Sequence, residues 1–162
     1  MSKFKIEPGY IRILKHSQNK VEFAIAEFVD NSIQSFEQNK KELKKIPGYK
    51  PTIDIDVGKD FIEIKDNCAG ISINDEKRAF SIAHANPDFK GVGTFGMGMK
   101  ISACWFTDFW EVETKALGEK EQKKWTIDVN KIALDSDTDI GPKKTKNDGN
   151  PYTKILLTNC FP

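Results

Sequence analysis

The sequence predicts a single α/β domain in which helices alternate with β-hairpins. Three observations lead to this fold class. Apolar residues recur at helical spacing from Val21 to about Ile46, alternating segments over 52–65 and 109–129 indicate two hairpins, and an apolar run over 152–158 indicates a central strand. A chain of 162 residues is long enough to bury one core. We therefore expect one domain over residues 1–162.

Charge and cysteine content exclude several classes of protein. The net charge is +1, so no global field attracts nucleic acid or a membrane surface. No apolar run approaches the roughly 18 residues of a membrane span, and no secretory apolar core follows the first residues. The cysteines Cys68, Cys104 and Cys160 are odd in number and lack metal-binding spacing. We expect reduced thiols in a cytoplasmic or nuclear protein with no membrane partner.

The long helix from Val21 to about Ile46 carries the first candidate site, and a short helix over 9–16 is expected before it. Glu27 and Asn31 are four positions apart, so they share one face of this helix, and apolar neighbours place them at the border of its buried side. One interpretation is a hydrogen bond between the two side chains on the helix surface. The other is a carboxylate that orients a water molecule beside an amide oxygen that binds a cation.

A basic segment follows on the same helix, at Lys40, Lys41, Lys44 and Lys45, before Pro47-Gly48 ends it. Cations at a helix C-terminus are favoured by the helix dipole, so a solvated helix end explains this segment. Contact with nucleic acid is the alternative interpretation, and it is also open for Lys143–Lys146.

The first hairpin runs into Asp66-Asn-Cys-Ala-Gly70. A carboxylate at the end of a strand, followed by small residues, can accept a hydrogen bond from a ligand amine. The same letters are also an ordinary strand-to-turn signal. Asn74 or Asp75 is then expected to cap a helix that reaches residues 80–82. Residues 83–92 are expected to form a flexible lid.

Glycines at positions 91, 93, 96 and 98 precede Lys100 and a buried helix that reaches about Phe106. A glycine-rich loop that feeds a helix start offers free N–H groups and the positive end of a dipole, which together bind phosphate. The spacing excludes a P-loop, and the protein-kinase companion motifs are absent. The letters Gly-x-Gly-x-x-Gly also fit a dinucleotide fingerprint, but no strand is expected directly before them. A tight packing contact remains the alternative.

The rest of the chain predicts mainly strands. The second hairpin comprises residues 109–115 and 124–129 and turns around 117–120. Residues 135–151 are polar and rich in Gly, Pro and Asn, which predicts a loop. Tyr152–Thr158 is expected to be a central strand because it is an apolar run.

Together these motifs resemble the GHKL superfamily, which includes gyrase-type topoisomerases, the large heat-shock chaperones, histidine kinases and MutL, and the related MORC ATPases. The Glu-x-x-x-Asn motif is matched by Glu27–Asn31, Asp-x-Gly-x-Gly by Asp66–Gly70, and Gly-x-Phe-Gly-x-Gly by Gly93–Gly98. A final threonine that opens a central strand is matched by Thr153. The resemblance covers nearly the whole chain and is closest to the MORC-like and MutL-like branches. Two positions depart from the pattern: Cys68 replaces the first glycine of the second motif, and Tyr152 replaces the glycine before the threonine.

The resemblance implies a two-layer sandwich of the Bergerat type, an α+β arrangement with one mixed sheet, helices on a single face, and ATP between the helices and a lid. It implies that Glu27 is the general base and that Asn31 binds Mg²⁺. It implies that Asp66 accepts a hydrogen bond from the adenine amino group, with Gly70 allowing close backbone approach and Thr153 supporting the adenine end. The residues implied to surround the phosphates are Gly93, Thr94, Phe95, Gly96, Met97 and Gly98. Lys100 either reaches the terminal phosphate or is an ordinary lysine at a helix start.

The resemblance also implies a function. We expect the N-terminal module of a longer protein that binds ATP with Mg²⁺, hydrolyses it slowly in isolation, and acts as a conformational switch that drives homodimerisation. Nucleic acid is a possible partner through downstream domains. The alternatives are a histidine-kinase-type phosphotransferase and a non-catalytic nucleotide-binding module. Against phosphotransfer, Glu27 suits activation of water, and His16 is too near the start of the chain to belong to a preceding phosphoacceptor helix.

Overall fold

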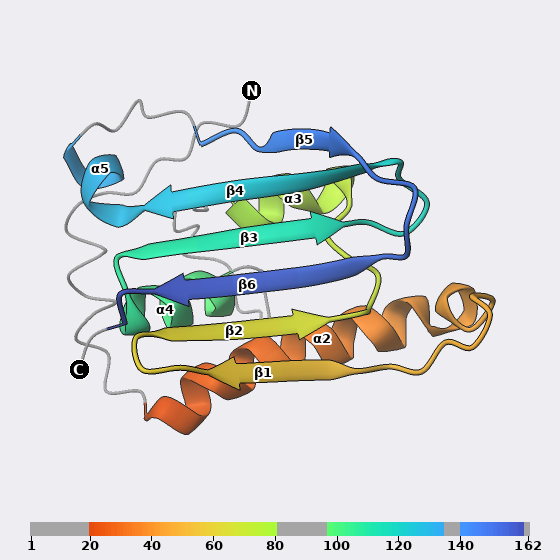
Figure 1. Cartoon of the computed structure of the whole chain (residues 1–162), viewed down its shortest axis with the longest axis horizontal. Helices are drawn as coiled ribbons and strands as arrows, with labels where there is room; N and C mark the ends of the chain where they lie inside the picture. Colours follow the sequence, from red (N-terminus) through yellow and green to blue (C-terminus); the bar gives the residue numbers. More distant parts are fainter. Residues whose placement is uncertain (1–19, 81–96, 135–139, 161–162) are drawn as a thin grey trace, which may run out of the picture.

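The computed structural model describes residues 20–80, 97–134 and 140–160, which form one six-stranded sheet with helices on one face (Figure 1). The strand order is β1-β2-β6-β3-β4-β5. The strands are β1 (Ile53–Val57), β2 (Phe61–Asp66), β3 (Phe109–Lys115), β4 (Glu121–Asp128), β5 (Lys143–Lys146) and β6 (Tyr152–Thr158). The helices are α2 (Val21–Leu43), α3 (Ile73–Phe80), α4 (Met97–Phe106) and α5 (Val129–Leu134). The expected helix over 9–16, the expected lid over 83–92 and the glycine-rich residues 91–96 lie outside the described residues.

The last strand in the sequence, β6, lies between β2 and β3, which confirms that it is central. Its Thr153 is opposite Asp66 on one side and Thr114 on the other. Every pairing among the described strands is antiparallel, which differs from the expected mixed sheet. The reason is the position of β6: β2 and β3 run in the same direction, and β6 separates them and runs opposite to both.

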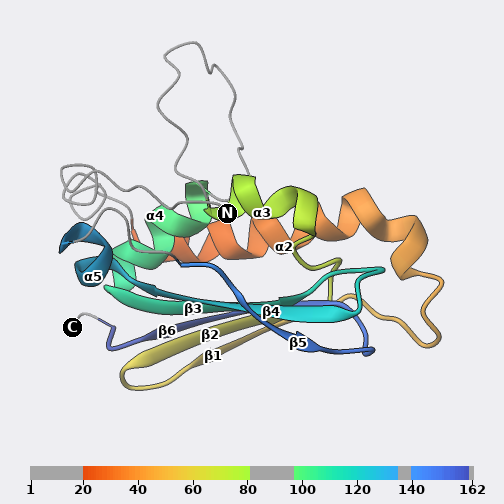
Figure 2. The same cartoon turned by 90° about the horizontal axis from the view of Figure 1, so that it is seen from above.

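The helices α2, α3 and α4 cover one face of the sheet, as Figure 2 shows. Side chains alternate along each strand, so every second residue faces these helices. Buried apolar residues on that face include Ile64, Val112, Ile127 and Leu157. From the helices, Phe28 and Phe80 pack against them, and the Phe80 ring stacks on Trp125 with centroids 4.2 Å apart. This layer of helices on the sheet is the α/β architecture that the sequence predicted.

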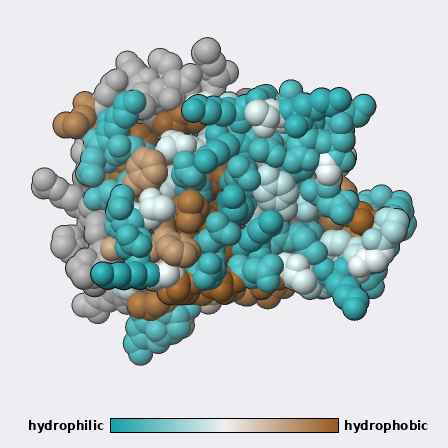
Figure 3. Space-filling model, viewed as in Figure 1, coloured by the Kyte–Doolittle hydropathy of each residue, from teal (hydrophilic) through white to brown (hydrophobic). Residues whose placement is uncertain are grey.

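The opposite face of the sheet is mainly polar, with smaller apolar areas (Figure 3). Its side chains pair across neighbouring strands: Lys124 with Glu111 at 2.8 Å, and Lys154 with Glu113 at 3.6 Å. The Tyr152 hydroxyl also donates to Glu113 at 2.8 Å. Such partly exposed ion pairs contribute little to stability. Among the described elements, the core therefore lies on the helix side of the sheet.

The observed helices and strands differ from the sequence expectations in some local details. The expected hairpins form, as do the expected helices that fall within the described residues. Ser72, rather than Asn74 or Asp75, caps α3: its carbonyl accepts the first helical hydrogen bonds, and its hydroxyl donates to Asp75 at 2.7 Å. The short α5 and the edge strand β5 were not expected. None of the described helices combines the length and apolar character needed to cross a membrane.

Candidate functional site

A pocket lies between α2 and the central strands, close to the start of α4. On α2 its residues follow helical spacing, so one face of the helix supplies four of them. The lining residues are Phe28, Asn31, Ser32 and Ser35 from α2, Asp66 from β2, Ile71, Met99 from α4, and Thr153 and Ile155 from β6. Three residues that the sequence singled out, Asn31, Asp66 and Thr153, therefore meet at one pocket.

Asp66 is the buried charged group of this pocket, with 8% of its surface exposed. It is the last residue of β2 and faces the helices, in line with Ile62 and Ile64. The Ser32 hydroxyl donates to its Oδ2 at 2.7 Å, and the backbone N–H of Cys68 donates to its Oδ1 at 2.9 Å. Burial raises the pKa of Asp66 above its ordinary value, although these hydrogen bonds act in the opposite direction. The carboxylate is therefore held in a fixed orientation at the pocket floor.

The glycine that this turn requires is Gly70, not the residue at position 68. Gly70 has φ +71°, and a Cβ built on it would lie 2.8 Å from Cα of Ala116 and would overlap the Lys115 carbonyl oxygen. Cys68 does not have a positive φ, so a side chain there strains nothing. Burial and the nearby Asp66 charge raise the pKa of the Cys68 thiol to about 12, so the thiol stays protonated. The departure from the motif is therefore compatible with the same turn.

Thr114 links the turn to the central strand, and sequence reasoning missed it. Its buried hydroxyl oxygen accepts from the Ile71 N–H at 2.9 Å and donates to the Tyr152 carbonyl at 2.9 Å. The same oxygen lies 3.3 Å from the Thr153 hydroxyl. A polar residue at an inward-facing position of an otherwise apolar strand, as in Val112-Glu-Thr114, is the signal that was available.

Two serines of α2 were also missed. Ser32 donates to Asp66, as described above, and Ser35 accepts from the Ala69 N–H at 3.2 Å through its hydroxyl oxygen. Both lie on the helix face that carries Phe28, which packs in the core. Small hydroxyl side chains at buried helical positions indicate local polar partners, and this pattern could have identified both residues.

Glu27 does not line the pocket. It is exposed, lies one turn before Asn31 on α2, and contacts the first turn of α4. A Cβ built on Gly98 would lie 3.0 Å from Cδ of Glu27 and would overlap its Oε2, so only glycine leaves this carboxylate in place. Glu27 therefore lies beside the first turn of α4, whose first N–H groups have no partner within the helix.

Lys100 also lies in the first turn of α4 and is 5% exposed. Burial lowers its pKa to about 8, so it remains largely protonated at neutral pH. Gly93, Thr94, Phe95 and Gly96 lie outside the described residues, and Met97 is described only as the first residue of α4. The proposed contact of Lys100 with phosphate stays a prediction.

Among the pocket residues, Asn31 could bind Mg²⁺ through its amide oxygen, whereas both oxygens of the Asp66 carboxylate already accept hydrogen bonds from the protein. No group of three or more His, Cys, Asp or Glu side chains that could hold a metal occurs within residues 20–80, 97–134 and 140–160.

Comparison with known families identifies the chain. A model of the family described as histidine kinase-, DNA gyrase B- and HSP90-like ATPases matches residues 19–155. The match spans α2, Asp66, the glycine-rich segment and Thr153. A search of curated proteins finds no match. Because the family match covers most of the sequence, the chain belongs to the histidine kinase-, DNA gyrase B- and HSP90-like ATPases, the GHKL superfamily that its motifs resemble.

Proposed function

We propose that this domain binds ATP together with Mg²⁺, hydrolyses it slowly, and acts as a nucleotide-dependent switch that drives homodimerisation. The family to which it belongs suggests ATP binding and switching. The observation that supports the proposal in this chain is the shared pocket of Asn31, Asp66 and Thr153, with Glu27 one turn away on the same helix.

The adenine end of the nucleotide would lie against Asp66. A carboxylate only accepts hydrogen bonds, so it suits the exocyclic amine of adenine and disfavours a carbonyl at the same place. Hydrogen bonds from the Ser32 hydroxyl and the Cys68 N–H fix the position of the carboxylate. Thr153, directly opposite Asp66 on β6, would support the same end of the base. Recognition of adenine is thus assigned to groups that the fold already orients.

The phosphate end would extend along α2 towards Glu27. Ser35, at the Asp66 end of the pocket, is eight positions after Glu27, which corresponds to about 12 Å along a helix. Asn31 lies between them and would bind Mg²⁺ through its amide oxygen. The cation would supply positive charge that offsets the charge of the phosphates. The glycine-rich residues 93–98 and Lys100 would hold the phosphates.

Glu27 is proposed as the general base. Its carboxylate is exposed, so water can reach it, and Gly98 leaves it room beside α4. A positioned carboxylate can accept the proton of a water molecule as that water attacks the terminal phosphate. Asn31, on the same helix face, keeps this base at a constant distance from the metal end of the substrate.

The test compares Glu27→Ala with Glu22→Ala, which removes another exposed carboxylate near the start of α2. For Glu27→Ala we expect ATP affinity within about threefold of the wild type and hydrolysis reduced by about 10²-fold or more. Glu22→Ala should change neither. ATP labelled on its terminal phosphate should yield free phosphate and no labelled protein. Unchanged hydrolysis in Glu27→Ala would contradict the assignment of the base.

A further inference from the structure

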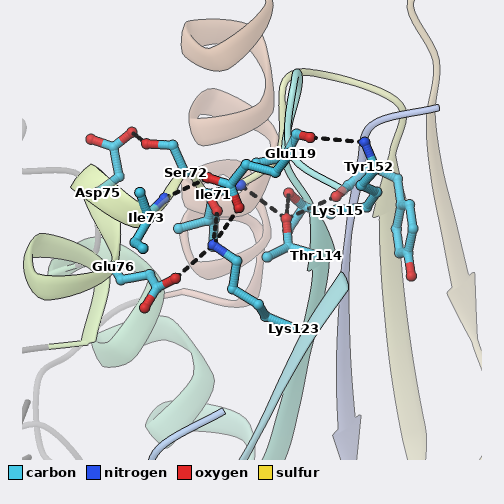
Figure 4. Close-up of polar contacts among 12 residues, drawn as sticks. Ile71, Ser72, Ile73, Asp75, Glu76, Thr114, Lys115, Glu119, Lys123 and Tyr152 are labelled. Atoms are coloured by element: carbon cyan, nitrogen blue, oxygen red, sulfur yellow. Dashed lines mark hydrogen bonds and ion pairs between the residues drawn. The ribbon is translucent and has the colours of Figure 1, made fainter. Parts of the chain in front are cut away.

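A buried lysine with two carboxylate partners lies beside the turn that follows Asp66. Lys123, on β4, is 1% exposed and points to the helix-covered face of the sheet, in line with Trp125 and Ile127. Its Nζ lies 2.6 Å from Glu76 Oε1 and 2.7 Å from Glu119 Oε2 (Figure 4). Glu76 belongs to the first turn of α3, and Glu119 to the turn between β3 and β4. The cluster therefore joins three separate segments.

Lys123 keeps its positive charge despite its burial. Burial alone would lower the pKa of Lys123, but hydrogen bonds and the charges of Glu119 and Glu76 raise it above the ordinary value. A buried ion pair adds little net stability compared with well-packed apolar residues. Charge-assisted hydrogen bonds are directional, so the ammonium and the two carboxylates fix the positions of the groups that they contact.

The oriented part is the peptide segment 69–73. The Lys123 ammonium is 3.5 Å from the Ile71 carbonyl oxygen, and the free oxygen of Glu119 accepts from the Ile73 N–H at 2.8 Å. Two further bonds fix the same segment: the Ile71 N–H donates to Thr114 at 2.9 Å, and the Leu117 N–H donates to the Ala69 carbonyl at 2.8 Å. In all four of these contacts, the group that holds the segment belongs to β3, β4 or the turn between them.

This segment forms part of the pocket. Ile71 lines it beside Asp66, and Gly70 packs against the end of β3 so closely that a side chain would not fit. Movement of the segment would therefore change the shape of the pocket at the Asp66 end. Asn31 and Glu27 lie outside the segment on α2, which contacts it through Ser35 and the Ala69 N–H.

We propose that Lys123, with Glu76 and Glu119, is a positioning residue for the nucleotide site: it fixes residues 69–73 as the pocket wall at the adenine end. This role rests on the proposed function. The role concerns only the adenine end of the substrate. The cluster contacts the segment proposed to lie against the base, and it does not contact Asn31 or Glu27, which are assigned to the metal and the water. Lys123 itself is not among the residues that line the pocket.

The test uses Lys123→Met, with Lys124→Met as the matched control. Lys124 is the next residue on β4, points to the opposite face, and makes a comparable ion pair with Glu111 at 2.8 Å. For Lys123→Met we expect amide hydrogen exchange at Ile71 and Ile73 in the free protein to accelerate by about tenfold or more. The KM for ATP should rise by about tenfold, with kcat at saturating ATP within about twofold. The preference for ADP over GDP should shrink. Lys124→Met should change none of these.

A second variant covers the case in which Lys123→Met does not fold. Glu119→Ala removes the acceptor for the Ile73 N–H but keeps the pair between Lys123 and Glu76, and Glu119 is on a turn with a quarter of its side chain exposed. It should raise exchange at Ile73 and the KM for ATP in the same direction. Unchanged exchange and KM in a folded variant would overturn the positioning role alone. Failure of the wild-type protein to bind ADP would overturn the proposed function and this role with it.

Discussion

At the scale of single residues, Asp66 combines a cost in stability with the binding role proposed for it. Burial raises its pKa, so the folded protein binds its proton more tightly than the unfolded chain does. Stability contributed by this group therefore falls as pH rises from the unfolded value near 3.8 through the raised native value. The hydrogen bonds from Ser32 and the Cys68 N–H offset part of that cost. A buried carboxyl group at this position thus lowers stability whenever it is ionised, and the role proposed for it is to accept a hydrogen bond from a ligand amine.

Replacing Asp66 with Asn tests this balance. Asp66→Asn should weaken ADP binding by about 10- to 100-fold, the equivalent of a lost hydrogen bond to a charged group. Its unfolding free energy at pH 7 should equal or exceed that of the wild type, since the desolvation cost of the charge is gone. Urea denaturation between pH 3 and 8 should show this difference shrinking towards acidic pH, where Asp66 is neutral in both states. A variant that is less stable only at high pH would contradict the argument.

Two glycines with similar backbone conformations allow the cost of backbone strain to be distinguished from the cost of steric overlap. Gly70 and Gly118 have φ +71° and +78°, but a Cβ at Gly118 meets nothing within 4 Å, whereas one at Gly70 overlaps the end of β3. Gly118→Ala should cost about 1–2 kcal/mol of unfolding free energy through the left-handed conformation alone. Gly70→Ala should cost about 1–3 kcal/mol more, because backbone atoms must shift. Urea denaturation of both variants measures the difference, and equal costs would refute the overlap.

At the scale of elements, the packing of α4 on α2 determines where Glu27 points. Gly98 provides the contact, and the atom that a new Cβ would meet is the far end of a flexible side chain. Gly98→Ala should therefore redirect the Glu27 carboxylate without unfolding the domain. Alanine in place of a helical glycine adds about 0.5–1 kcal/mol of stability, which partly masks the overlap.

The prediction for Gly98→Ala is a loss of hydrolysis by about tenfold or more, with ADP affinity and melting temperature close to the wild-type values. A double-mutant cycle with Glu27→Ala checks the route of the effect. If the variant acts by moving Glu27, the double variant should be no slower than Glu27→Ala alone. Additive losses would mean that Gly98 matters for another reason, such as the phosphate-binding backbone.

The same scale explains which elements the sequence could predict. The helix α2 and the strands of both hairpins have strong local periodicity, so their residues alone indicated them. The strand β5, Lys143-Lys-Thr-Lys146, has four exposed residues and no apolar alternation, and it exists because it pairs with the edge of β4. The helix α5 is only six residues long, and its local signal is Asp128, whose Oδ1 accepts from the Lys131 N–H at 3.1 Å. Elements that depend on a partner elsewhere in the chain leave little local trace.

At the scale of the whole molecule, the candidate site depends on contacts that join distant parts of the sequence. Asp66 and Thr153 are opposite each other only because β6 inserts between β2 and β3, and the sequence indicated a central strand without giving its neighbours. Motif letters could identify Glu27, Asn31 and Asp66 as candidates. They could not reveal Thr114 or the Lys123 cluster, because these act through backbone groups of the turn rather than through a motif. Family motifs thus predicted the residues proposed to touch the nucleotide, while the structure was needed to find those that support them.

Because the pocket is built from α2, β2, α4 and β6 around one core, a ligand bound there should stabilise the whole domain. At a free ADP concentration of 100 times Kd, the linkage amounts to about 2.7 kcal/mol. For a domain of this size that corresponds to a rise in melting temperature of about 5–11 °C.

Trp110 and Trp125 are both in the core, so tryptophan fluorescence and far-UV circular dichroism should report the same transition, with and without ADP. A chelator should reduce the shift if Mg²⁺ contributes to binding, and Asp66→Asn should reduce it at the same ADP concentration. No shift with millimolar ADP and Mg²⁺ would contradict nucleotide binding, and a shift in only one of the two probes would contradict a single cooperative core.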